Sequence, residues 1–169
     1  MLHGWTNFFN LTGAAGAQLI GLLFVVATLG TALSTSQSLA GIRAFITPTL
    51  VNFGGVLFQA VVVLTSWQSD WPIGVILALG GLAGLAYQIS AIRLKRKLDF
   101  VVLHALDWIP YGAIPVAGNA SLIAGGVGLI AEKTFAPYAI AAASMLLLFA
   151  GIYGAWDFTL WIITNRGKT

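Results

Sequence analysis

Apolar residues run along this chain in five long stretches, and short polar segments separate them. A helix of about 20 apolar residues spans the hydrocarbon core of a bilayer, which is about 30 Å thick. Backbone polar groups in lipid need internal partners, so helices are the expected elements. The pattern therefore predicts an all-α, polytopic integral membrane protein. We expect one domain over residues 1–169, a bundle of five transmembrane helices at about 12–35, 46–67, 72–92, 104–131 and 137–163.

The fourth stretch is less regular than the others. His104 and Asp107 interrupt its apolar beginning, and Pro110 and Pro115 follow. Proline removes a helical hydrogen bond and its ring clashes with the preceding turn. We therefore expect the fourth helix to be kinked or broken at Pro110/Pro115. The alternative is a re-entrant element at residues 100–109.

Composition supports membrane insertion and excludes several classes of function. The chain is 59% hydrophobic and 8% charged, whereas soluble domains carry about 25% charged residues. No basic stripe is interleaved with aromatic residues, so no nucleic-acid partner is expected. Cysteine is absent. His3 and His104 would lie on opposite sides of the membrane, so they could not jointly ligate haem iron. We expect no metal site and no cofactor.

The positive residues are unevenly placed. With five crossings, seven of the eight Lys and Arg residues fall on one side and only Lys133 falls on the other. Cytoplasmic loops carry the excess of positive charge. The sequence thus predicts an outside N-terminus and a cytoplasmic C-terminus, in a bacterial inner (plasma) membrane. A four-span alternative, in which residues 100–131 do not cross, weakens this bias.

The densest positive cluster follows the third stretch and consists of Arg93, Lys95, Arg96 and Lys97. Basic residues beside a transmembrane helix attract anionic lipid headgroups. We interpret the cluster as an anionic-lipid anchor of general rather than lipid-specific character.

Polar residues recur at one depth in the cytoplasmic half of the predicted bundle. Asp107 lies ten residues after Lys97 and Asp157 nine before Arg166, so each is roughly 13–15 Å along a helix from that flank. Residues i and i+3 share a helix face, which places His104 beside Asp107. One layer of the bundle is therefore expected to hold Arg43, Gln88, His104, Asp107 and Asp157.

Two interpretations of this layer remain open. It lines a pocket or ion path that opens to the cytoplasm, or it is a structural clamp in which Arg43 pairs with Asp157 or Asp107. Ionisable residues inside a membrane usually face the bundle interior and find partners. We favour the clamp slightly, because these five side chains can satisfy one another without a ligand.

Two further features concern helix packing. Asn52 and Gln59 are seven residues apart and share a face, which should point at protein and form interhelical hydrogen bonds. Gly80 and Gly84 form a GxxxG pair, with more small residues in the fourth and fifth stretches. Such faces let backbones approach closely, and they make self-association an expected property.

No zincin, P-loop or nucleophile-elbow motif occurs, so an enzyme is the least favoured class. The leading hypothesis is a small channel or transporter-type protein with a cytoplasm-facing polar pocket. The alternative is a non-catalytic membrane subunit or scaffold that packs against a larger partner. The expected partners are the lipid bilayer and either further copies of the chain or another membrane protein.

Overall fold

The computed structural model describes residues 2–33, 39–97 and 109–164, and leaves aside the side chains of 30–33, 39–45, 94–97, 161, 162 and 164. The described residues contain helices and no strand. In chain order the helices are η1 (His3–Trp5), α1 (Thr6–Leu33), α2 (Leu39–Leu64), α3 (Asp70–Lys97), η2 (Ile109–Ala113), α4 (Ile114–Ile130) and α5 (Ala136–Thr164).

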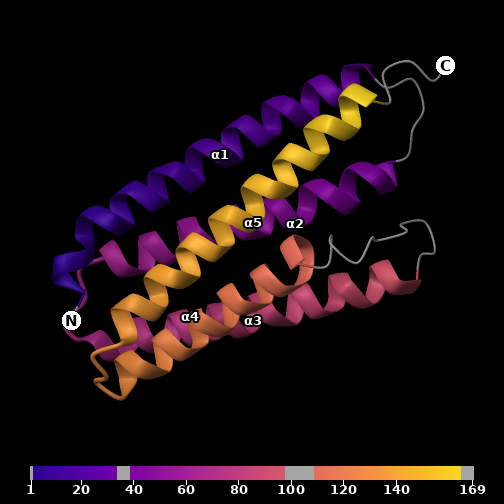
Figure 1. The fold of residues 1–169 in the computed structure, drawn as a ribbon. Coiled ribbons are helices and arrows are strands. Elements are labelled where there is room, and N and C mark those ends of the chain that lie inside the picture. The colour runs from indigo at the N-terminus through magenta and orange to yellow at the C-terminus, as the bar shows by residue number, and fades with distance from the viewer. Residues whose placement is uncertain (1, 34–38, 98–108, 165–169) are drawn as a thin grey trace.

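The long helices run up and down, so that consecutive helices are antiparallel (Figure 1). Helix α1 packs on α2, α2 on α5, α5 on α4 and α4 on α3, while α2 and α3 touch less. The N-terminal residues, the α2–α3 connection and the α4–α5 connection lie at one end of the bundle (Figure 1). The end of α1, the start of α2, the end of α3 and the end of α5 lie at the other.

Five helical segments are long and apolar enough to cross a membrane, which confirms that part of the prediction for the described residues. These segments are His3–Leu29, Ile46–Leu64, Asp70–Arg93, Ile109–Ile130 and Ala136–Leu160. Their outer faces carry large apolar side chains that are more than half exposed, among them Leu22, Phe24, Leu79, Phe149 and Trp156.

Small residues bring α3 and α4 into backbone contact. A Cβ atom added at Gly74 would lie 2.6 Å from the carbonyl oxygen of Gly126, and one added at Gly81 would lie 3.0 Å from that of Asn119. The first distance is too short for any side chain, and a Cβ atom at Gly81 would also lie 2.8 Å from Cγ1 of Ile123, so glycine suits both positions where these helices cross. The small-residue faces of α3 and α4 therefore meet each other within the chain.

The GxxxG pair of the third helix has two different neighbours. The position of a Cβ at Gly80 is occupied by the ring of Phe58 from α2, and that at Gly84 by the side chain of Asn119 from α4. Both glycines are thus covered by described residues of the same chain.

The beginning of the second helix differs from the expected one, whereas the expected beginning of the fourth helix at residue 104 lies outside the described residues. Helix α2 starts at Leu39, so Pro48 lies inside it and not in its first turn, where a missing N–H would cost nothing. The described part of the fourth segment opens with a π-helical turn, η2, which contains Pro110, and α4 follows with Pro115 near its start. A bend at Pro110/Pro115 stays a prediction, and the re-entrant alternative falls mainly on residues outside the described ranges.

Candidate functional site

Two buried amides connect α2 to α3. The Nε2 atom of Gln88 donates a hydrogen bond of 2.9 Å to the Oδ1 atom of Asn52. Only 2% of the Gln88 surface and 5% of the Asn52 surface is exposed. Asn52 therefore faces protein, as its spacing from Gln59 predicted, but its partner comes from α3.

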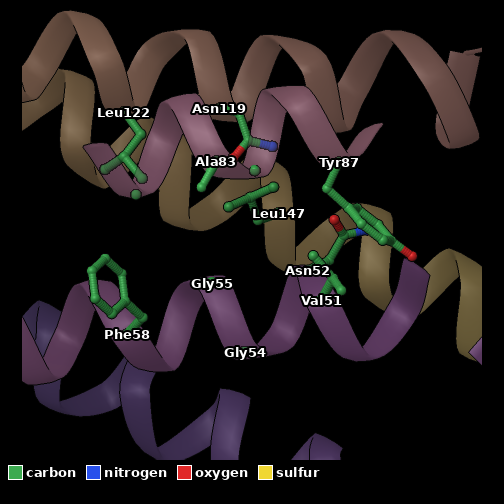
Figure 2. A pocket seen from close by; sticks show the side chains of 12 residues that line it. Val51, Asn52, Gly54, Gly55, Phe58, Ala83, Tyr87, Asn119, Leu122 and Leu147 are labelled. Carbon is green, nitrogen blue, oxygen red and sulfur yellow. The ribbon is translucent and has the colours of Figure 1, made fainter. Parts of the chain in front are cut away.

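Next to this pair, a pocket of about 370 Å³ lies between α2, α3, α4 and α5 (Figure 2). Its walls are mostly apolar, and glycines from α2 and α3 are part of the lining. It extends along α2 from Val51 to Phe58, about 10 Å at 1.5 Å per residue. The lining consists of Val51, Asn52, Gly54, Gly55, Phe58, Gly80, Ala83, Gly84, Tyr87, Asn119, Leu122 and Leu147.

The second amide in the lining, Asn119 of α4, is 5% exposed. Its Nδ2 atom donates to the backbone carbonyl of Pro115 at 2.8 Å, one turn earlier in the same helix. Its Oδ1 atom lies against Gly84 and accepts no hydrogen bond from a described residue. The side chain therefore donates a hydrogen bond to its own helix, and its acceptor oxygen stays unpaired beside α3.

Asn52 has the opposite arrangement. Its Oδ1 accepts from Gln88, and its Nδ2 donates to no described residue. Among the described side chains, the only fully enclosed polar atom without a hydrogen-bond partner is Nε2 of Gln59, whose Oε1 accepts from Ser144 Oγ at 2.8 Å. The unpaired atoms of Asn52 and Asn119 are thus accessible, and both residues line the pocket.

A separate polar contact joins the π-helical turn to α5. The Tyr111 hydroxyl donates to Oδ2 of Asp157 at 2.5 Å, and the Tyr111 ring stands edge-to-face with Tyr153 at 5.7 Å between centroids. A distance this short is typical of a hydroxyl that donates to a carboxylate. π-Helical turns in proteins are frequent at functional sites.

The structure thus gives Gln88 and Asp157, two members of the predicted layer, different hydrogen-bond partners: Asn52 and Tyr111. His104, Asp107 and the side chain of Arg43 lie outside the described residues. The choice between a five-residue pocket and an Arg43 clamp therefore stays a prediction. Within the predicted lipid anchor, the Arg93 side chain is exposed at the end of α3, and the side chains of Lys95, Arg96 and Lys97 also lie outside the described residues.

The sequence patterns did not single out two residues that line the pocket, Tyr87 and Asn119, or the partner of Asp157, Tyr111. Asn119 had a signal, because it is a lone amide in a stretch of glycine, alanine and aliphatic residues. Tyr111 had no such signal, because its partner Asp157 lies 46 residues away and no sequence spacing connects the two. Tyr87 has no distinguishing pattern beyond its place next to Gln88.

Neither a protein-family model, a curated protein nor a solved structure matches this chain. In the part of the chain that the structure describes, no group of three or more His, Cys, Asp or Glu side chains is arranged to hold a metal ion.

Proposed function

We propose that this protein is a small, multi-pass membrane protein of the transporter type, with its substrate site in the pocket between α2, α3, α4 and α5. One observation carries this proposal: Asn52 and Asn119 are nine-tenths-buried amides that line a mostly apolar pocket, and each has one accessible polar atom without a hydrogen-bond partner among the described residues. Buried polar groups are normally hydrogen-bonded. A ligand or water in the pocket would supply the missing partners.

The size and place of the pocket favour a ligand. Small-molecule sites are typically concave, about 300–1,000 Å³ in volume, mostly apolar with a few placed polar groups, and often lie between the helices of a bundle. The pocket of about 370 Å³ has these properties. If the amides only held the helices together, we would expect both polar atoms of each side chain to be hydrogen-bonded within the protein.

The surface favours a bilayer as the solvent. The five candidate spans have mean hydropathies of 1.6 to 1.8, and their outer faces are apolar. Aromatic side chains gather at the N-terminal end, where Trp5 stands edge-to-face with Tyr138 and Trp67 and Trp71 are exposed. Tryptophan and tyrosine are enriched at membrane–water interfaces.

Charge supports the proposed orientation. Helix α2 carries Arg43 near its start and α3 ends in the cluster from Arg93 to Lys97, and both lie at the end of the bundle opposite the N-terminus. Lys133 lies in the α4–α5 connection at the other end. We propose that the Arg93–Lys97 end is cytoplasmic, because positive residues are retained on that side.

Flux into proteoliposomes tests the transporter proposal. Gly54 lines the pocket, and a Cβ atom there would have nothing within 4 Å, so Gly54→Leu fills the pocket without a clash at Cβ. Gly21 of α1 has the same free space outside the pocket, which makes Gly21→Leu the matched control. The probes are protons, rubidium ions, glycerol and benzamide.

We expect at least one probe to cross faster than in protein-free liposomes, with Gly54→Leu abolishing the excess and Gly21→Leu retaining it. Rates equal to the blank for every probe, or an excess unaffected by Gly54→Leu, would overturn the proposal. A protein without flux that purifies in fixed ratio with a larger membrane protein would instead support the subunit alternative.

A further inference from the structure

The described lining of the pocket contains no charged side chain. Amides, a tyrosine, glycines and aliphatic or aromatic side chains make up the whole of it. Moving an ion into such a site removes its hydration without an opposite charge to replace it, and this is strongly unfavourable. The pocket should therefore discriminate against charged ligands.

The unpaired atoms define what a neutral ligand must offer. Nδ2 of Asn52 is a hydrogen-bond donor, so it requires an acceptor on the ligand. Oδ1 of Asn119 is an acceptor, so it requires a donor. A ligand that carries both a carbonyl-type acceptor and an N–H or O–H donor satisfies both side chains.

The apolar part of the lining defines the rest of the ligand. Phe58 and Leu122 stand toward one end of the pocket and Asn52 toward the other, with Leu147 between them (Figure 2). A closed apolar cavity of about 150 Å³ is known to bind benzene, and this pocket is more than twice as large. A six-membered ring with a polar substituent therefore fits within it.

We infer that the pocket binds a small, uncharged molecule in which a ring or short aliphatic body carries a carboxamide-like donor–acceptor group. The ring lies among Phe58, Leu122 and Leu147, and the polar group engages the unpaired atoms of Asn52 and Asn119. This inference rests on the proposed function, because it names the substrate class of the same site.

Benzamide and benzoate distinguish this inference from nonspecific apolar binding. The two molecules have nearly the same shape, but benzamide is neutral with a donor and an acceptor, whereas benzoate is an anion. Equilibrium dialysis of each radiolabelled probe against the full-length protein in mild detergent gives the dissociation constants. We expect saturable binding of benzamide, and binding of benzoate weaker by about tenfold or more.

Substitutions in the lining test whether benzamide binds in this pocket. Gly54→Leu should weaken benzamide binding by about tenfold or more because it occupies the pocket, while Gly21→Leu should leave it unchanged. Asn52→Leu and Asn119→Leu should each weaken it by about two- to tenfold, the effect of one hydrogen bond. Circular dichroism and gel filtration identify any variant that does not fold, and Gly54→Leu decides the question if the amide variants fail.

Absent benzamide binding, equal affinity for benzoate, or unchanged binding in folded Gly54→Leu would each overturn the inference. These results are separable from a failure of the proposed function. Pocket-dependent ion flux without benzamide binding contradicts the ligand class alone. Benzamide binding that depends on the pocket, with no probe crossing proteoliposomes, contradicts transport alone.

Discussion

At the scale of single residues, amides and a tyrosine–carboxylate pair hold together helices that are far apart in sequence. Asn52 meets Gln88 36 residues later, and Gln59 meets Ser144 85 residues later. Each interhelical hydrogen bond in a membrane protein contributes about 0.6 kcal/mol on average. Their main effect is therefore to select which faces meet, because an amide left against lipid or an apolar neighbour lacks any partner.

The Tyr111–Asp157 contact provides the test at this scale. Tyr111→Phe keeps the ring and removes the donated hydrogen bond, so unfolding free energy in a denaturant titration should fall by roughly 0.5–1.5 kcal/mol. Asp157→Asn should cost less, because an amide oxygen still accepts from the tyrosine. Tyr138→Phe is the control, since Tyr138 is 66% exposed and its change should stay within about 0.5 kcal/mol. Equal losses in both tyrosine variants would contradict a specific role for the contact.

At the scale of helices, glycine decides which pairs come closest. Gly74 and Gly81 of α3 face Gly126 and the Asn119–Ile123 turn of α4, and their backbones approach where a side chain would collide. On the other side of the bundle, Gly151 of α5 receives the buried ring of Phe53 from α2. The van der Waals contacts made at this close approach stabilise the helix pairs, because the hydrophobic driving force is weak between helices surrounded by lipid. The α3–α4 crossing in turn positions Gly84 and Asn119 at the pocket.

Enlarging Gly81 tests the α3–α4 crossing. A Cβ there would lie 2.8 Å from Cγ1 of Ile123, so Gly81→Val should force the helices apart and lower the unfolding free energy by about 1–3 kcal/mol. Gly21→Val makes the same substitution where a Cβ meets nothing, which subtracts the effect of valine on helix propensity. The crossing is misassigned if the two variants lose the same stability in parallel titrations.

At the scale of the whole molecule, the five long helices of the described residues alternate in direction, so the start of α1 and the end of α5 lie at opposite ends of the bundle (Figure 1). The basic residues are concentrated at one of these ends, while the aromatic residues Trp5, Trp67 and Trp71 lie at the other. The pocket lies between them, so a bilayer around the bundle would place it at membrane depth. The side of the membrane from which a ligand reaches the pocket then depends on the orientation of the chain.

Labelling of single cysteines tests the proposed sidedness, and the absence of natural cysteine makes the background clean. We expect an impermeant maleimide to label Ser69→Cys and Lys133→Cys in intact cells, and Arg93→Cys only after permeabilisation. All three positions are exposed at the ends of helices or in connections. Protection of Lys133→Cys with labelling of Ser69→Cys would show that the fourth helix does not cross. Labelling of Arg93→Cys alone in intact cells would reverse the orientation.

The sequence by itself determined the coarse class of the described residues: helices without strands, five of them long and apolar enough to span a bilayer. It also showed where the basic residues cluster along the chain. These properties depend on local runs of apolar residues and on where charges stand in the chain, both of which can be counted without knowing any contact. It also indicated that Asn52 and Gln59 face protein, because helical spacing alone puts them on one face.

Only the tertiary structure decided which faces meet. Several amides were available to Asn52, and the packing of α3 through its glycines selected Gln88. The pocket arises because α2 and α3 touch each other less than α2 touches α5 and α3 touches α4, which no single helix encodes. Partner choice depends on the fit of distant surfaces, so the hydrophobic pattern sets the helices and close packing sets the site.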